Sequence, residues 1–171
     1  IFNNGFTSGL GGDGVVLCST AHPLQSGTTA SNTYAVQAEL SETSLETALI
    51  AIAGFTDDRD IPVALQAKTL HIPRQLVFVA ERLLKSPGRV GTADNDINAS
   101  NSMGMLPGGY IVNHRFTDTN NFFIRTDSPN GMKMFNRAPI KTSMEGDFET
   151  GNVRYKARER YSFGFTDWRG V

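Results

Sequence analysis

The sequence predicts an α+β fold, and three features carry this prediction. Two segments have the apolar spacing of amphipathic helices; one begins near Ser41 and the other at Pro73. Short apolar stretches bounded by turn residues predict strands before and after the second helix. The stretch 152–166 alternates apolar and basic side chains, which is typical of a strand with two different faces. A chain of 171 residues is long enough to bury a core of its own.

The first helix is predicted to begin after Ser41 and to end at Gly54. Ser41 suits the N-cap, and Leu40 and Leu45 are spaced to pack together across the helix start. Glycine is a frequent helix terminator, so Gly54 marks the end. Five apolar residues then form one stripe that faces the core: Leu45, Ala48, Leu49, Ile52 and Ala53.

A strand at 69–72 and the second helix are predicted to follow each other directly. Pro73 ends the strand and fits the first position of a helix, where its missing N–H costs nothing. The helix ends at 86–88, a Ser-Pro-Gly sequence. Its apolar stripe consists of Leu76, Val79, Ala80, Leu83 and Leu84. Two helices that flank a strand favour an arrangement of helices on a sheet.

The remaining chain is predicted to hold a glycine-rich start with a short strand at 15–18, and a long surface loop at 88–109. Strands at 110–114, 122–126 and 132–136 are expected to form a meander of hairpins. Asn130-Gly131 supports a hairpin between the last two, because this dipeptide favours two-residue turns. A polar connection through Pro139 and Gly146 then leads to the long strand.

The long strand 152–166 has an apolar, aromatic face and a basic face. The basic face carries Arg154, Lys156, Arg158 and Arg160. Such a row of cations needs anionic neighbours, and three interpretations are open: a subunit contact, a nucleic-acid track, or a solvated face. An acidic cluster of Glu145, Asp147 and Glu149 offers ionic partners within the chain or in a neighbouring copy. The net charge of −1 gives the whole chain no electrostatic signature of nucleic-acid binding.

Other candidate sites have weak support. Cys18 and His22 have the residue types of a nucleophile and its base, but a buried thiol is favoured for Cys18. The segment 94–98 starts like a calcium loop, yet Ala99 and Met105 replace the glycine and glutamate that such a loop needs. His71 and His114, both placed on strands, lack a partner at metal-ligand spacing. We therefore assign no catalytic, cofactor-binding or metal-binding residue, and the single cysteine indicates a reducing compartment.

Several segments together resemble a known family. They are 13–18, 21–24, the helix after 40–42, the region 70–73, the loop 95–98 and the ending 161–170. Their order is similar to that of the Mu-like major head subunit family of tailed bacteriophages, whose fold is that of the Hong Kong type capsid protein. The resemblance implies an axial lobe at 43–137, with helices on a sheet, and peripheral-lobe segments at 1–42 and 138–171. The N-terminal arm, extended loop and spine helix of that fold have no counterpart here and are expected before Ile1.

The resemblance also implies a function. It predicts a non-enzymatic major capsid subunit that forms pentamers and hexamers and closes into an icosahedral shell around double-stranded DNA, which it contacts weakly. Scaffold, portal and decoration proteins are further expected partners, no membrane is expected, and assembly would take place in the bacterial cytoplasm. The candidate subunit contacts are Arg154, Lys156, Arg158, Arg160, Asp167 and Trp168. The alternatives are a binding module, such as a tail or adhesin component with exposed tips at Asn120 and Asn130, and a Cys/His hydrolase.

Overall fold

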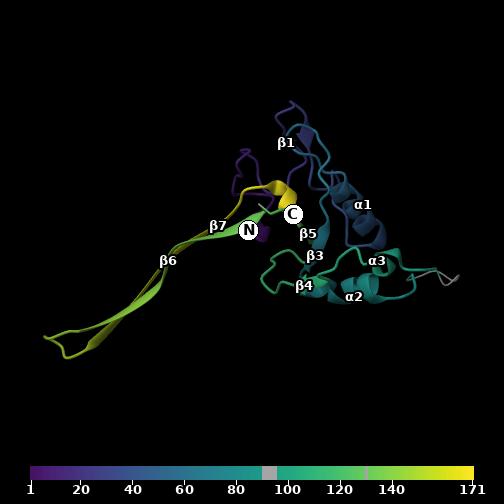
Figure 1. Ribbon diagram of the computed structural model, residues 1–171. Coiled ribbons are helices and arrows are strands. Elements are labelled where there is room, and N and C mark those ends of the chain that lie inside the picture. Colours follow the sequence, from purple (N-terminus) through teal and green to yellow (C-terminus); the bar gives the residue numbers. More distant parts are fainter. Residues whose placement is uncertain (90–95, 130) are drawn as a thin grey trace.

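The chain folds into a body and a long arm in a computed structural model that describes residues 1–89, 96–129 and 131–171. The body holds the helices and the short strands, and the arm is a two-stranded hairpin that extends far from it (Figure 1). The elements of the body are, in order, η1 (Phe2–Asn4), β1 (His22–Pro23), β2 (Thr29–Ala30), α1 (Glu42–Ala53), β3 (Ala67–Ile72), η2 (Arg74–Leu76), α2 (Val77–Lys85), α3 (Ala99–Ser102), β4 (Tyr110–Val112), β5 (Phe123–Thr126) and η3 (Trp168–Gly170). The arm consists of β6 (Met132–Gly146) and β7 (Val153–Phe165).

Helix α1 confirms the predicted boundaries. The Ser41 side chain accepts a hydrogen bond from the Ser44 N–H, and the Ser44 side chain accepts one from the Ser41 N–H, so the first turn is capped from both sides. At the other end the Gly54 N–H donates to the carbonyl oxygens of the last turn. The apolar stripe is buried at Leu45, Leu49 and Ile52, whereas Ala53 is exposed.

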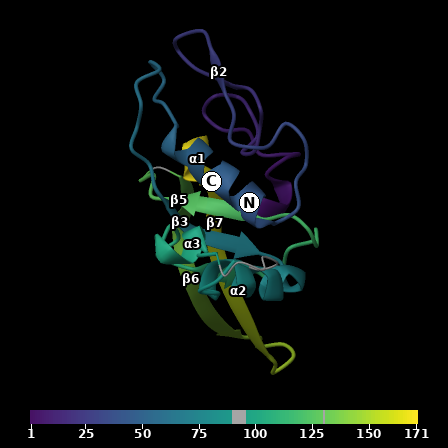
Figure 2. The same cartoon turned by 90° about the vertical axis from the view of Figure 1, so that its right-hand side faces the viewer.

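The central sheet has the strand order β4-β3-β5 and supports the main core. Strand β3 was predicted, and it runs parallel to β4 and antiparallel to β5. Its Leu70 and Ile72 side chains are fully buried in one cluster with the stripe of α1, Ala80 of α2 and Ile124 of β5. On the neighbouring register positions, Phe123 of β5 belongs to a second cluster with Leu17, Cys18 and Val171. Figure 2 shows the sheet between α1 and α2.

The predicted meander is wrong. Strands β4 and β5 both pair with β3 and not with each other, while β6 pairs with β7 in a separate sheet. Strands β5 and β6 therefore lie in different sheets, and Asn130 of the expected hairpin turn lies outside the described residues. Turn residues show where a strand stops, but the strands that lie beside β3 come from segments that no turn signal links to it.

The hairpin β6–β7 confirms the long strand and corrects the segment before it. The expected polar connection through Pro139 and Gly146 is part of β6, which pairs with β7 from Met132↔Phe165 to Gly146↔Val153. Two register shifts, between Asn136 and Ala138 and between Ala138 and Lys141, insert extra residues on β6. Pro139 lies in this irregular stretch, where a missing N–H is tolerated in a strand.

Two further expectations, the strand 15–18 and the loop 88–109, are changed. The predicted strand 15–18 is reduced to a single bridge, Leu10↔Val16, because Leu17 and Cys18 turn into the second core cluster. The predicted loop 88–109 contains α3, and its Asn98 is buried and donates to the carbonyl oxygens of Leu83 and Ser86. Asp94 and Asn95 of the weak calcium-loop pattern lie outside the described residues. The expected lobe boundary between residues 137 and 138 falls inside β6.

Candidate functional site

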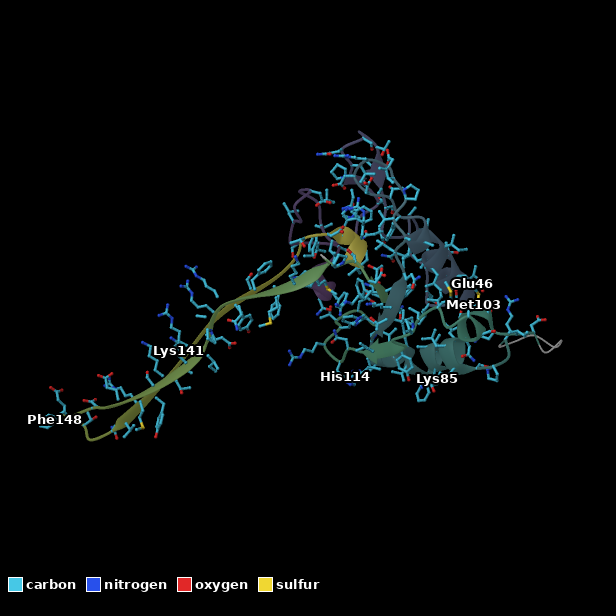
Figure 3. All side chains as sticks on the ribbon, in the orientation of Figure 1. Glu46, Lys85, Met103, His114, Lys141 and Phe148 are labelled. Atoms are coloured by element: carbon cyan, nitrogen blue, oxygen red, sulfur yellow. The ribbon has the colours of Figure 1, made fainter. Side chains whose placement is uncertain are left out.

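The arm is the strongest candidate for an interaction surface. It projects from the body, and Phe148 lies at its tip with Lys141 part of the way along (Figure 3). Thirteen residues in β7 at ~3.3 Å each give the arm a length of roughly 43 Å. Most residues of both strands are exposed, and the partly covered ones are Ala138 and the residues near the body. A two-stranded hairpin is at best marginally stable in water, so this arm gains from a surface that covers it.

One face of the arm is apolar and aromatic. Directly paired residues share a face, so Met134 lies beside Phe163 and Met144 lies beside Tyr155. Tyr161 and Phe163 meet edge to face with ring centroids 5.2 Å apart. The exposed members of this apolar face are Met134, Met144, Val153, Tyr155, Tyr161 and Phe163, and each exposes half or more of its surface. Asn136, Thr142 and Glu159 interrupt this face, but so many exposed apolar side chains on one face indicate an interaction site.

The other face, here called the basic face, carries Lys141, Arg154, Lys156, Arg158 and Arg160. Arg154 is paired with Asp147 at 2.8 Å. The other four cations have no carboxylate within salt-bridge distance in the described part of the chain. Lys141 lies directly opposite Arg158 across the hairpin. Like charges in such cross-strand positions repel, so the isolated arm holds an unfavourable concentration of positive charge.

The outer end of the arm, residues 145–149, comprises the last two residues of β6 and the start of the turn and is here called the acidic tip. Its carboxylates belong to Glu145, Asp147 and Glu149. Asp147 organises the turn, because its side chain accepts hydrogen bonds from the Glu149 N–H and from Arg154. Phe148 lies between the carboxylates and is fully exposed, at 102% of the reference surface. The acidic tip therefore combines negative charge with one unburied aromatic ring.

Charge is distributed unevenly between the arm and the rest of the chain. Residues 132–165 contain seven cations and four carboxylates, a net charge of +3. The other residues contain nine cations and thirteen carboxylates, a net charge of −4, and the two values agree with the total of −1. The near-neutral total thus hides a basic arm on an acidic body, which favours contact between different parts of different copies.

The side chains of Asp13, His22 and Asn32 form a hydrogen-bonded cluster near the base of the arm, here called the joint. Asn32 directs its side-chain amide N–H groups at the carbonyl oxygens of Leu17, Trp168 and Val171, at 2.7, 3.1 and 3.3 Å. The Ser19 N–H donates to Asn32 Oδ1, and His22 Nε2 lies 3.2 Å from the same oxygen. The joint therefore links the N-terminal segment to the last residues of the chain.

His22 is the centre of this joint and is fully buried. Its Nδ1 donates to Asp13 Oδ2 at 2.6 Å, and its ring stacks on Trp168 with centroids 4.6 Å apart. Because Nε2 faces the Asn32 oxygen, both ring nitrogens face acceptors. His22 is therefore held on three sides, by Asp13, by Asn32 and by the Trp168 ring.

Two of the expected contact residues, Asp167 and Trp168, lie beside the joint and interact within their own chain. Trp168 is buried, with an exposed fraction of 5%, and it packs between His22 and Phe55. Asp167 accepts hydrogen bonds from Ser128 and from Arg169 in its own chain. Arg169 further binds Asp58 and covers the Trp168 ring. Trp168 is therefore a core residue, and the exposed candidates are the four cations of β7.

The structure separates the proposed Cys18–His22 pair. Both ring nitrogens of His22 are engaged by Asp13 and Asn32, which leaves neither for the thiol. Burial raises the pKa of the Cys18 thiol to about 12, so the thiol stays protonated at neutral pH. The thiol packs in the second core cluster, which matches the buried-thiol interpretation.

The other two histidines do not form a site among the described residues. His71 lies in β3 as predicted, and burial, followed by the charge of Arg125, lowers its pKa. His114 lies in the turn after β4 and not on a strand. Within residues 1–89, 96–129 and 131–171, no group of three His, Cys, Asp or Glu side chains is placed to hold a metal ion. In the same residues, no helix combines the length and apolarity needed to cross a bilayer.

A hollow of about 570 Å³ opens between the N-terminal segment, α1 and residues 116–124. Its walls are largely aromatic and apolar, with Phe6, Tyr34, Phe55 and Phe122 among them. Asp118 is the one charged residue among its described lining. The other titratable side chains of its described lining are Cys18 and Tyr34, and burial raises the pKa of both.

Sequence analysis missed several residues of the arm and its joint. Lys141 was assigned to a polar connection, and only the pairing of β6 with β7 places it on the basic face. Phe148 was not singled out, although a lone aromatic between two carboxylates in a turn is a detectable signal. Asp13 and Asn32 carry no local signal, because their partners lie far away in the sequence.

Comparison with known proteins supports a structural role. Neither the curated proteins nor the solved structures contain a match. A family model described as phage capsid protein matches residues 2–171, which is nearly the whole chain. The chain therefore belongs to the phage capsid protein family, a family of structural virion proteins that build multi-subunit shells.

Proposed function

We propose that this protein is a major head subunit that assembles with copies of itself into an icosahedral shell around the double-stranded DNA genome. The observation that carries the proposal is the arm, which exposes an apolar face and a basic face far from the body (Figure 1). Exposure of this much apolar surface to water is unfavourable for a monomer. The exposure ends when another subunit covers the arm.

The charge distribution supports contact between different surfaces of neighbouring copies. A basic arm that meets an acidic body makes a heterologous contact, and such contacts close into rings or extend into larger arrays. Rings of five and six subunits that tile a shell would use the same contact many times. Each contact can then be weak, because many simultaneous contacts multiply the avidity.

The proposal includes the finer family assignment. The chain is a member of the Mu-like major head subunit family, with the Hong Kong type fold. Residues 43–137 form its axial lobe, and residues 1–42 and 138–171 form peripheral-lobe segments. The central sheet with α1 and α2 suits the axial lobe, and the arm suits a peripheral one. Since β6 crosses residue 138, the arm as a whole belongs with the peripheral segments.

The proposed partners follow from this role. The shell encloses DNA, and weak non-specific contacts with phosphates suffice for an inner surface. Scaffold, portal and decoration proteins are further partners of such a shell. Assembly in the bacterial cytoplasm precedes incorporation into the virion.

The experiment is charge reversal on the arm in the full-length product of the gene. Arg158→Glu with Arg160→Glu should abolish particles seen by light scattering and negative-stain microscopy. The matched control reverses two exposed cations of the body, Arg74→Glu with Arg82→Glu, and should leave particles intact. Circular dichroism and the fluorescence of Trp168 verify that both variants are folded.

Two results would count against the proposal. Particles of normal size and yield from the arm variant would show that the basic face is not an assembly contact. A wild-type protein that stays monomeric when concentrated, with scaffold present, would favour the binding-module interpretation over a shell.

A further inference from the structure

We propose that the acidic tip of one arm binds the basic face of the arm of a second copy, and that the two arms do so reciprocally. This inference rests on the proposed function, because it names the partner surface that the arm meets during assembly. It is argued from the charges, the pairing register and the exposure of the arm itself.

The basic face requires an anionic partner. Lys141, Lys156, Arg158 and Arg160 lie close together on one face of the hairpin and have no carboxylate partner in the described part of the chain. Lys141 and Arg158 are directly opposite each other, so their repulsion is built into the fold. A docked carboxylate relieves this repulsion and forms charge-assisted hydrogen bonds.

The acidic tip supplies such carboxylates. In the described chain, Glu145 and Glu149 have no side-chain ion pair, whereas Asp147 is paired with Arg154. Glu145 lies opposite Arg154 at the outer end of the arm, whereas Lys141, Lys156, Arg158 and Arg160 lie between this end and the body. The hairpin is continuous and extended, with Phe148 at its tip and Lys141 part of the way along (Figure 3). Carboxylates for these four cations therefore come from another copy, and the tip of a second arm offers them together with an exposed aromatic ring.

Charge also selects the orientation of the two arms. Parallel arms would set cations against cations, whereas antiparallel arms bring each acidic tip to the basic face of the other. The step from residue 153 to residue 158 is about 17 Å at ~3.3 Å per residue, so the overlap involves the outer part of each arm. Both contacts then form at once around a two-fold axis, which makes the surface self-complementary.

Phe148 adds an apolar anchor to the contact. It is fully exposed in the single chain and lies between two of the carboxylates. Aromatic side chains that are buried at the centre of an interface carry much of the binding energy, and surrounding polar contacts exclude water from them. The tip therefore supplies both charge complementarity and an aromatic ring that gains from burial.

Nucleic acid fits the basic face less well than a second arm. The aromatic residues Tyr155 and Tyr161 lie on the opposite face. In the described arm a single aromatic ring, Phe135 opposite Ser162, shares the face with the cations, whereas stacking of successive bases uses several rings. The carboxylates of the tip lie at the end of the same arm and repel phosphates. Duplex DNA is kept as an alternative outcome of the test.

The first test uses charge exchange in the full-length protein. The tip variant combines Glu145→Lys with Glu149→Lys, and the face variant combines Lys156→Glu with Arg158→Glu and Arg160→Glu. Each variant alone should lower particle yield at least tenfold. A third protein carries all five substitutions and should regain most of the yield, because the charges are complementary again.

The second test detects the contact directly and does not depend on particles. Ser143→Cys leaves all charges unchanged, and Ser143 lies on the basic face opposite Lys156, about 10 Å from the outer end of the strand at ~3.3 Å per residue. This position is close to the two-fold axis that sets the tip of one arm beside residue 158 of the other, so the substituted positions of the two arms meet there. Mild oxidation should therefore produce a covalent dimer on a non-reducing gel, since the native Cys18 is buried. The control, Ser102→Cys on the body, should remain monomeric.

The outcomes separate this inference from the proposed function. If the tip variant assembles like the wild type, or if the five-substitution protein is folded but gains nothing, the inference is overturned while the shell role stands. Loss of duplex DNA binding in the face variant, without any cross-linked dimer, would assign the basic face to nucleic acid. A cross-linked dimer in a protein that never forms particles would keep the inference and reject the shell role.

Discussion

Asn32 is predicted to be the most important single polar side chain of the joint, and its replacement by alanine tests that. Its side chain approaches five polar groups, three carbonyl oxygens through Nδ2 and two donors through Oδ1. Since an amide has two N–H protons, about four hydrogen bonds are fully made at one time. The Asn32→Ala change removes all of them and leaves His22 without one acceptor.

The expected cost follows from these numbers. A typical hydrogen bond contributes about 0.5–1.5 kcal/mol net, and partial access of water to this joint reduces the loss. We expect a decrease of about 2–4 kcal/mol in the free energy of unfolding. With a urea m-value of roughly 2 kcal/mol per M, the unfolding midpoint should fall by about 1–2 M.

Fluorescence of Trp168 is a suitable assay because the chain has a single tryptophan and it lies beside the joint. Urea titration of the wild type and of Asn32→Ala, each followed by this signal, gives the two midpoints. Asn136→Ala on the arm is the matched control, since this asparagine is exposed and should change the midpoint little. A midpoint for Asn32→Ala within about 0.3 M of the wild type would refute the assigned role of the joint.

Three further predictions concern the same region. Burial raises the pKa of the Cys18 thiol to about 12, so at pH 8 this thiol should resist iodoacetamide until urea unfolds the protein. Modification of the folded protein at the rate of an unfolded peptide would contradict this. His22→Phe keeps a ring for stacking but removes both ring hydrogen bonds and leaves the Asp13 carboxylate without His22, so the free energy of unfolding should fall by about 2–4 kcal/mol. An unchanged melting temperature in thermal unfolding would show that stacking alone holds the joint. An added Cβ on Gly170 would lie 2.5 Å from the Gly131 Cα, so Gly170→Ala should lower the free energy of unfolding in urea by about 1–3 kcal/mol. Gly12→Ala, with open space around it, should leave this free energy unchanged, and equal unfolding midpoints for the two variants would contradict the close approach.

The sequence by itself determined the elements whose signals are local. Helix α1 begins after Ser41 and ends at Gly54 because capping side chains and a glycine stand at those positions. Strand β7 follows from its alternation of apolar and basic residues, which holds over 13 residues. The four cations of β7 follow for the same reason, since a period of two fixes the face of each side chain whatever the strand pairs with.

Tertiary structure decided the partners of these elements. Both neighbours of β3 come from distant segments, and pairing over long distances depends on which faces are buried together and not on turn residues. The full length of β6, which places Lys141 on the basic face, appears only when β7 lies beside it. Trp168 was expected at a subunit contact, yet it stacks on a buried His22 that precedes it by more than a hundred residues. Local patterns fix what each segment prefers, whereas burial of side chains from distant segments fixes where it lies.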